Sequence, residues 1–341
     1  METLFVKGLY RNSRILVGEP LSSLKEYIPG RNVFIITDKN LHRLYAGHIP
    51  DYPAYVMEPG ENSKKINTVA KICKWLMDEG AGRDAFILGV GGGVVCDMTG
   101  FVASIFLRGV EFGFVATSLM AQIDASIGGK NGVNLNGYKN IMGTFKQPAF
   151  VMCDTTMLSS LPKAELKHGL AEAVKHSLIS DRQMFNLLKE NAESVLKLDE
   201  DAVYKLVNRS IKTKIEIVNK DEVEQGERRK LNLGHTWGHA VEKTDGIPHG
   251  QAISIGLAFA AKLSVHRGKL STAEHKEIVS LLMNLGLPVA SATSPKTIFK
   301  ALLKDKKKET DHIHFVLMEG IGDVVVEPIP IQELKDFVRM L

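Results

Sequence analysis

The stretch "DAFILGVGGGVVCD" (84–97) decides the fold class of this chain. A short run rich in apolar residues leads into three consecutive glycines, and a helical pattern follows from Val94 to about Leu107. This order predicts a buried strand, a tight turn and a helix. Backbone N–H groups at the start of such a helix favour a bound phosphate, and glycines let the phosphate approach closely.

The glycine spacing differs from that of the usual dinucleotide fingerprint. Val94 stands where GxGxxG would place its last glycine. The loop by itself therefore leaves two interpretations open. It either binds a pyrophosphate group or forms a tight strand-to-helix turn that binds nothing, and the first is favoured.

Strand and helix patterns alternate on both sides of this stretch. An amphipathic helix is predicted at 66–80, where it stops at Gly80. Strands are predicted at 32–38, 54–60, 84–90, 111–117 and 149–154. Such alternation is typical of a mainly parallel, Rossmann-like sheet that is covered by helices.

The pattern changes after about residue 160, where most segments carry the helical period. Strand signals return only at 313–329, which predicts a small hairpin. We therefore expect an α/β N-terminal domain at 1–158 and a mainly α-helical C-terminal domain at 159–341. A cleft between two domains is the default place for a ligand.

Length and composition narrow the class of protein. A chain of 341 residues suggests two domains, and 44% hydrophobic with 24% charged residues is typical of a soluble globular protein. The net charge of +4 gives no argument for nucleic acid but suits small anionic ligands. The first 20 residues lack the apolar core of a signal peptide, and no apolar run approaches the roughly 20 residues that span a membrane. The 3 widely spaced cysteines predict reduced thiols, so we expect a cytoplasmic protein.

The segment 117–140 gathers polar side chains where a ligand crevice is expected. In a parallel sheet, the loops after the carboxyl ends of strands line that crevice. Lysines on a glycine-rich backbone suit a phosphorylated substrate, whereas a solvated surface loop is the alternative. The side chains in question are Thr117, Ser118, Asp124, Lys130, Lys139 and Asn140.

Two sets of residues in the helical half compete as metal ligands. His168, Glu172 and His176 share one face of one predicted helix, but its outer pair is separated by about 11 Å along the axis. Glu172, His235 and His249 come from three segments and would give a catalytic zinc three ligands and an open position. The second set has glycines beside its histidines. The residues alone leave the choice open, because most single histidines have no metal.

Six segments, in order, resemble the 3-dehydroquinate synthase family. They are "PGENSK" (59–64), "GGGVVCDMTGF" (91–101), "TSLMAQIDASIGGKNGVN" (117–134), "YKNIMGTFKQP" (138–148), "GLAEAVK" (169–175) and "LNLGHTWGHAVE" (231–242). The resemblance implies a homodimeric lyase of the shikimate pathway, in aromatic amino acid biosynthesis. It implies conversion of 3-deoxy-D-arabino-heptulosonate 7-phosphate to 3-dehydroquinate and phosphate, in the phosphorus–oxygen lyase class. NAD would serve as a recycled cofactor beside one divalent metal, zinc or else cobalt.

The resemblance also implies roles for individual residues. The metal ligands would be Glu172, His235 and His249. The NAD contacts would be Asp38, Asn40, Glu61, Lys64, Gly91, Gly92, Gly93, Val94, Asp97, Thr117, Ser118, Lys130, Lys139 and Ser160. The substrate contacts would be Asp124, Lys130, Asn140, Lys175, Lys214, Arg228, Asn232 and His239, with Lys306 or Lys307 at the phosphate end. Arg108 resembles an arginine that reaches the site of the neighbouring subunit.

Three other functions remain as alternatives. One is another sugar-phosphate cyclase, such as an enzyme of the 2-deoxy-scyllo-inosose synthase type, but Arg228 and Asn232 suit a substrate carboxylate. Another is an NAD- and metal-dependent polyol dehydrogenase, which would accumulate NADH. The third is a non-catalytic NAD-binding protein, which has no need of the ligand triad. Cys96 departs from the family pattern, since a glycine is common at that position beside the cofactor diphosphate.

Overall fold

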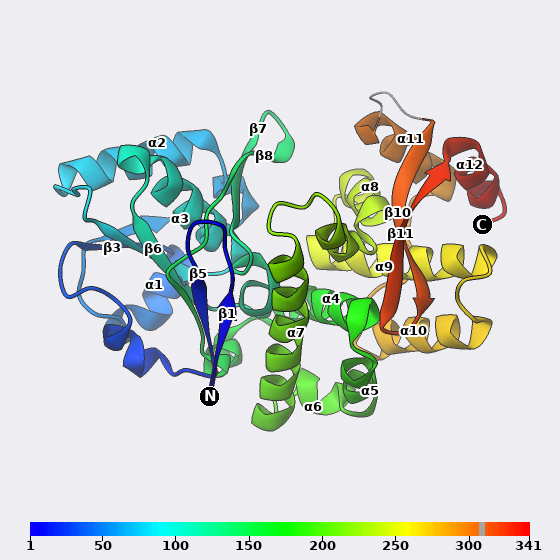
Figure 1. Ribbon diagram of the computed structural model, residues 1–341, viewed down its shortest axis with the longest axis horizontal. Helices are drawn as coiled ribbons and strands as arrows, with labels where there is room; N and C mark the ends of the chain where they lie inside the picture. Colours follow the sequence, from blue (N-terminus) through cyan, green and yellow to red (C-terminus); the bar gives the residue numbers. More distant parts are fainter. Residues whose placement is uncertain (307–310) are drawn as a thin grey trace. The chain divides into compact units, whose positions relative to one another are not determined.

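The computed structural model describes residues 1–306 and 311–341, which divide into two compact units (Figure 1). Unit 1 comprises Met1–Leu161 and Lys214–Val223, and unit 2 comprises Pro162–Thr213 and Glu224–Leu341. The segment Lys214–Val223 joins unit 1 through side-chain contacts with the N-terminal residues. Asn219 Oδ1 accepts a hydrogen bond from the backbone N–H of Lys7, and Glu222 Oε2 accepts one from that of Leu9. The helical periodicity of the sequence does not predict that Lys214–Val223 belongs to unit 1.

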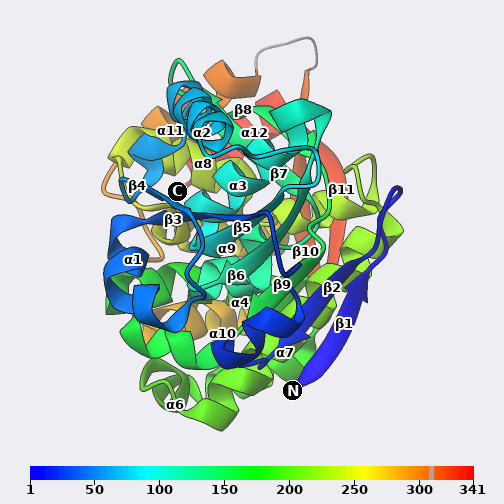
Figure 2. The same cartoon turned by 90° about the vertical axis from the view of Figure 1, so that its left-hand side faces the viewer.

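Unit 1 contains a seven-stranded sheet in the order β1-β2-β9-β6-β5-β3-β4 (Figure 2). Its strands are β1 (Glu2–Val6), β2 (Ser13–Val17), β3 (Val33–Asp38), β4 (Ala54–Met57), β5 (Phe86–Gly91), β6 (Glu111–Ala116) and β9 (Phe150–Cys153). Only β1 and β2 pair in antiparallel fashion; the other neighbours are parallel. The predicted mainly parallel α/β sheet is confirmed, and β1 and β2 are additions to it.

Alternating side chains build the core of this sheet. Phe86, Leu88 and Val90 of β5 all belong to one buried cluster on one face, because successive side chains of a strand point to opposite faces. The longer helices of unit 1 are α1 (Lys39–Tyr45), α2 (Ile66–Asp78) and α3 (Gly93–Ile105). The 3-10 helices are η1 (Leu21–Glu26), η2 (Ala46–His48), η3 (Glu61–Ser63), η4 (Phe106–Arg108) and η6 (Thr155–Ser160).

The segment 117–140 is more regular than the loop expected from its glycines. A π-helical turn, η5 (Ala121–Ala125), is followed by the antiparallel strands β7 (Lys130–Leu135) and β8 (Tyr138–Phe145). The hairpin turns at Asn136 and Gly137, whose φ angles are 50° and 81°. Asn-Gly is a strong two-residue hairpin signal because both positions need positive φ. The second half of the segment, for which no strands were predicted, is therefore a hairpin.

Unit 2 is mainly helical, as predicted. Its helices are α4 (Lys163–Ser180), α5 (Arg182–Glu190), α6 (Ala192–Leu196), α7 (Glu200–Lys220, of which the part from Lys214 belongs to unit 1), η7 (Glu227–Asn232), α8 (His235–Asp245), α9 (His249–His266), α10 (Thr272–Asn284), α11 (Pro295–Lys306) and α12 (Ile331–Arg339). The predicted hairpin is formed by β10 (His312–Gly320) and β11 (Asp323–Pro330). In the core, the rings of Trp237 and Phe259 stack with centroids 3.8 Å apart, which fixes α8 against α9.

The cysteines form no disulfide, in agreement with the predicted reduced thiols. Cys96 and Cys153 are fully buried, and burial raises the pKa of both thiols far above the ordinary value. Both are therefore unreactive core residues. Across the residues that the structure describes, none of the helices combines the length and apolar character that a membrane span requires.

Candidate active site

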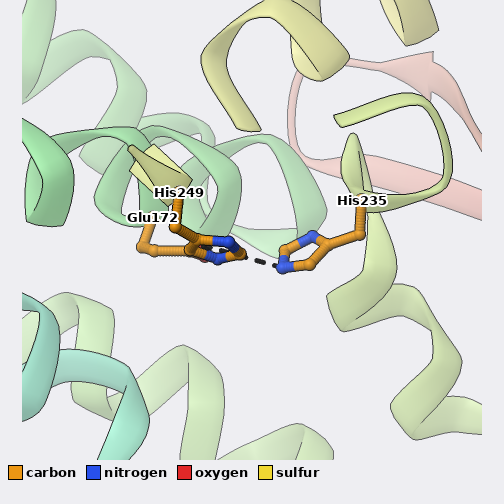
Figure 3. A group of neighbouring side chains, drawn as sticks. All are labelled: Glu172, His235 and His249. Carbon is orange, nitrogen blue, oxygen red and sulfur yellow. Dashed lines mark ion pairs between the residues drawn. The ribbon is translucent and has the colours of Figure 1, made fainter. Parts of the chain in front are cut away.

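Glu172, His235 and His249 come from three different helices and point toward one another (Figure 3). Glu172 Oε1 lies 3.3 Å from His249 Nε2 and 3.7 Å from His235 Nε2. The two histidines are the first residues of α9 and α8, and Glu172 sits in the buried middle of α4. One donor atom from each residue lies within 4.8 Å of the others. The structure thus brings together the three-segment set.

The second oxygen of Glu172 has a different partner. Lys175 Nζ lies 2.5 Å from Glu172 Oε2, and the two side chains are only 2% and 1% exposed. The ammonium neutralises one side of the carboxylate and leaves Oε1 to face the histidines. The resemblance placed Lys175 among the substrate contacts, whereas in the structure it forms an ion pair with the proposed metal ligand Glu172.

The two histidines differ in protonation. Burial, followed by the nearby Lys175 ammonium, lowers the pKa of His235 to about 3. Burial also lowers the pKa of His249, but hydrogen bonds and charges of Glu172 and Glu242 outweigh it and raise that pKa to about 9. In the metal-free protein near pH 7, His235 is therefore neutral, and His249 is protonated and positively charged between two carboxylates. A carboxylate and two imidazoles fit a divalent metal, which would replace that proton.

The one-helix set is not assembled among the described residues. His168 Nδ1 lies 3.3 Å from Glu165, and His176 Nδ1 lies 2.6 Å from Ser210 Oγ. Both outer histidines therefore have partners other than Glu172. This agrees with the separation expected for residues two turns apart on one helix.

A cavity of about 540 Å³ in unit 2 adjoins His235. It contains Asn232 and His239, which the sequence assigned to the substrate, and the His239 ring centroid lies 5.2 Å from that of His235. The remaining lining residues are Glu224, Arg229, Thr236, Ala240, Leu302, His314, Val316 and Val326. Imidazoles, an amide, a carboxylate and a guanidinium line one side of this cavity and suit a small polyhydroxylated anion.

The sequence missed several of these lining residues. Glu224 Oε1 accepts a hydrogen bond of 2.6 Å from Asn232 Nδ2, which orients the predicted amide. Arg229 lines the cavity, whereas the predicted Arg228 is 2% exposed and is not among the lining residues. These residues lie in a polar stretch without periodicity. The two adjacent arginines at 228–229 indicated that a positive charge is available here. Their order in the sequence did not indicate which of them lines the cavity.

In unit 1, the glycine loop forms a narrow turn into α3. A methyl group on Gly92 would lie 3.4 Å from Ser118 Oγ, and one on Gly93 would lie 3.1 Å from the Cβ of Ala125. No side chain caps this end of α3, and the Cys96 N–H donates a hydrogen bond to the Gly92 carbonyl. The N–H groups of the first turn thus suit a phosphate. Cys96 itself is buried below the loop.

Three predicted NAD-contacting residues are joined to this loop by their side chains. Lys64 Nζ lies 2.5 Å from Asp97 Oδ2 on α3. Glu61 Oε1 accepts a hydrogen bond of 2.7 Å from Asn134 Nδ2 on β7. The Asn134 N–H donates to the Lys64 carbonyl over 2.9 Å. The segment 61–64, the glycine loop and the hairpin are therefore linked within unit 1.

Other predicted cofactor residues have local partners. Asp38 caps α1, since its Oδ1 accepts hydrogen bonds from the N–H groups of Asn40 and Leu41. Ser160 Oγ lies 2.8 Å from the Tyr45 hydroxyl. The Thr117 N–H donates to the Gly91 carbonyl and holds the end of β6 beside the loop.

The remaining predicted residues of unit 1 are spread over its elements. Lys214 forms an ion pair with Asp124, so the helix α7 reaches the π-helical turn. The Asn140 N–H donates to Asn134 Oδ1 over 2.9 Å. Lys130 and Lys139 are exposed on the hairpin. Arg108 is exposed and has a φ of 69°. Lys307 lies outside the described residues.

Changing Lys64 to methionine tests the buried ion pair. The Asp97 carboxylate would lose its cation, which costs about 2 kcal/mol of unfolding free energy. Burial already raises the pKa of Asp97 and Lys64 opposes that rise, so the folded-state pKa in the variant lies above the unfolded one. The loss of unfolding free energy relative to the wild type is therefore largest at pH 8 and shrinks as the pH falls toward 4. Urea unfolding at several pH values measures it.

Lys74→Met is the matched control for this change, because Lys74 pairs with Asp78 on the exposed face of α2. That variant should lose less than about 0.5 kcal/mol at every pH. Equal losses in the two variants would contradict the role given to the buried pair.

Comparisons with known proteins identify the family of this chain. Residues 54–168 match the family model "3-dehydroquinate synthase N-terminal", and residues 169–308 match "3-dehydroquinate synthase C-terminal". The 3-dehydroquinate synthase of Leptospira interrogans serogroup Icterohaemorrhagiae serovar copenhageni is 38% identical, with 97% of this chain and 95% of the relative covered.

Solved structures show the same fold over nearly the whole chain. A 2-deoxy-scyllo-inosose synthase, complexed with carbaglucose-6-phosphate, NAD+ and Co2+, has a TM-score of 0.86 at 26% identity, covering 99% of this chain and 100% of that one. The 2-epi-5-epi-valiolone synthase of Streptomyces hygroscopicus subsp. jinggangensis 5008, with NAD+ and Zn2+ bound, has a TM-score of 0.87 at 27% identity, covering 98% of each chain. With two family models across 54–308 and a close relative along nearly its full length, the chain belongs to the 3-dehydroquinate synthase family.

Proposed function

We propose that this chain converts 3-deoxy-D-arabino-heptulosonate 7-phosphate to 3-dehydroquinate and phosphate, with NAD and one divalent metal, zinc or cobalt. The observation that carries the proposal is the convergence of Glu172, His235 and His249 in a member of this family. The same donor types bind catalytic zinc in many enzymes. The two solved relatives named above hold NAD+ with Co2+ or Zn2+.

The reaction needs a temporary ketone. When bound, NAD+ would supply a reversible hydride acceptor for a substrate alcohol, and the metal would supply a Lewis acid for the oxygen at that carbon. The ketone makes the neighbouring proton acidic, so that phosphate leaves by β-elimination. The same hydride then returns, and an intramolecular aldol step closes the ring. The elimination breaks a carbon–oxygen bond, so a carbon–oxygen lyase describes it better than the phosphorus–oxygen class expected from the sequence.

The proposed roles divide between the two units. In unit 1, the glycine loop with Glu61, Lys64 and Asp97 would hold NAD. In unit 2, the metal ligands and the cavity with Asn232 and His239 would hold the substrate. The wider assignment of residues 1–158 to NAD and 159–341 to metal and substrate is part of this proposal.

His239 and Asn232 have distinct tasks in this proposal. His239 lies beside both metal-site histidines, with ring centroids 5.2 Å and 5.8 Å from those of His235 and His249. From this position its imidazole can move a proton to or from a substrate oxygen. Asn232, held by Glu224, keeps an amide in the same cavity and orients the substrate.

A set of charged and amide side chains would orient the substrate, and the cationic members would stabilise its anionic groups. Those proposed for this role are Asp124, Lys130, Asn140, Lys175, Lys214 and Arg228. For the phosphate end we propose Lys307, and Arg108 acting on the site of a second subunit in a homodimer.

An assay of phosphate release tests the proposed function. Protein loaded with zinc is incubated with the heptulosonate phosphate and a catalytic amount of NAD+, and phosphate, cyclic product and absorbance at the NADH maximum are followed. Phosphate should exceed NAD+ many-fold while NADH stays near its starting level, since each hydride returns.

Two outcomes would contradict the proposal. Stoichiometric NADH would indicate a polyol dehydrogenase. Much faster turnover of glucose 6-phosphate than of the heptulosonate phosphate would indicate a cyclase of the inosose type.

A further inference from the structure

His249 has a carboxylate on each side of its ring. Its Nε2 lies 3.3 Å from Glu172 Oε1, and its Nδ1 lies 3.4 Å from Glu242 Oε2. A neutral imidazole carries one N–H and one lone pair. If Nε2 gives its lone pair to the metal, Nδ1 must carry the hydrogen, and Glu242 is the group placed to accept it.

His235 shows the same arrangement with a different acceptor. Its Nδ1 lies 3.1 Å from the carbonyl oxygen of Leu233, and its Nε2 faces Glu172. Both histidines are therefore held at Nδ1 and present Nε2 to the same carboxylate oxygen. Partners at Nδ1 hold the orientation of both rings before the metal arrives, and for His249 the partner also fixes the tautomer once Nε2 has lost its hydrogen to become a ligand.

We propose that Glu242 is a positioning residue of the metal centre, which accepts the Nδ1 hydrogen of His249 and thereby tightens metal binding. The inference rests on the metal site of the proposed function and adds a residue outside its three ligands. Glu242 follows His235 by seven residues, two turns along the same side of α8, so one helix supplies a ligand and the support for another. Its side chain is only 11% exposed, which keeps the contact away from bulk water.

A competing arrangement makes Glu242 a direct ligand. Donor atoms of His239, Glu242 and His249 also lie within 4.8 Å of one another. That set would use the opposite nitrogen of His249, because Nδ1 is the atom near Glu242. The set with Glu172 is favoured because its carboxylate is 1% exposed and its second histidine is already held at Nδ1, whereas His239 is exposed.

Zinc affinity of the metal-free protein separates these arrangements without relying on turnover. The affinity of the wild type, Glu242→Gln and Glu242→Leu is measured by competition with a chromophoric chelator. The leucine variant should bind zinc roughly 10–100-fold more weakly, as is usual when an outer carboxylate is lost. The glutamine variant should lose about two- to tenfold, because its amide oxygen still accepts the hydrogen but carries no charge. Glu193→Leu is the control, since Glu193 is an exposed residue of the same unit that pairs with Lys197.

The absorption spectrum of cobalt-loaded protein supplies a second measurement. At saturating Co2+, both Glu242 variants should keep the wild-type band positions, because the three ligands are unchanged. Shifted bands together with metal retention in His235→Ala would overturn the proposal and make Glu242 a ligand. Wild-type zinc affinity in the glutamine variant would overturn it as well, even if the leucine variant fails to fold. If the wild type turns over substrate and every Glu242 variant binds zinc with wild-type affinity, this inference is refuted while the proposed function stands.

Discussion

Replacing His249 by alanine should remove the bound metal and, with it, phosphate release from the heptulosonate phosphate. The imidazole Nε2 lies 3.3 Å from Glu172 Oε1 at the first residue of α9, and alanine offers no nitrogen at this position. Loss of an outer partner alone costs about 10–100-fold in metal affinity, so loss of a ligand should cost more than 100-fold. His235→Ala should behave in the same way. Metal content after dialysis and the rate of phosphate release measure both effects.

Two other histidines of α4 provide the controls. His168→Ala and His176→Ala should retain the metal, because His168 contacts Glu165 and His176 contacts Ser210 through Nδ1. His176 is fully buried, so its variant is also checked for lower stability. Loss of metal in these controls, with retention in His249→Ala, would refute the ligand assignment and favour the one-helix set.

The second large effect is expected for Gly256→Ala in the middle of α9. A methyl group there would overlap the carbonyl oxygen of Gly234, which has a φ of 78° and immediately precedes His235. It would also lie 3.0 Å from the backbone nitrogen of Gly238. Backbone atoms cannot turn aside as a flexible side chain does, so α8 must shift. We expect a loss of about 3 kcal/mol in unfolding free energy, at the upper end for an overpacked core.

The same change should weaken metal binding, because the start of α8 carries His235. Urea unfolding of the metal-free protein measures the first effect, and zinc competition measures the second. Gly47→Ala is the control, since a methyl group there meets nothing within 4 Å and Gly47 is not among the residues with positive φ. It should change stability by less than about 1 kcal/mol. A Gly256→Ala protein as stable as this control would show that α8 and α9 are not in backbone contact.

Much of the fold could be predicted from local patterns. The strands of the parallel sheet and the helices of unit 2 follow from apolar periodicity, because the side chains that repeat at period 2 or 3.6 are those that build the core. β1 and β2 were missed, since their exposed, charged residues obscure the alternation. The hairpin β7–β8 was missed although its Asn-Gly turn was present in the sequence.

The candidate site could be predicted only in part. Glu172, His235 and His249 were named through the resemblance, but spacing alone left two ligand sets open. The sequence did not predict the positions that the structure gives to four other residues, Lys175, Glu224, Arg229 and Glu242. Their partners lie on other elements, or on the same helix in an orientation that sequence spacing does not fix, so nothing in the chain order assigns them.

The sequence by itself determined the two kinds of unit, the glycine-rich turn into α3 and the residue types available for chemistry. These depend on contacts between near neighbours in the chain and on hydrophobic periodicity, which the order of residues records directly. The tertiary structure decided which histidine nitrogen faces the carboxylate, which arginine lines the cavity and which acid supports His249. These depend on how α4, α8 and α9 pack, and packing is fixed by backbone contacts such as that between Gly256 and Gly234, which are 22 residues apart in the chain.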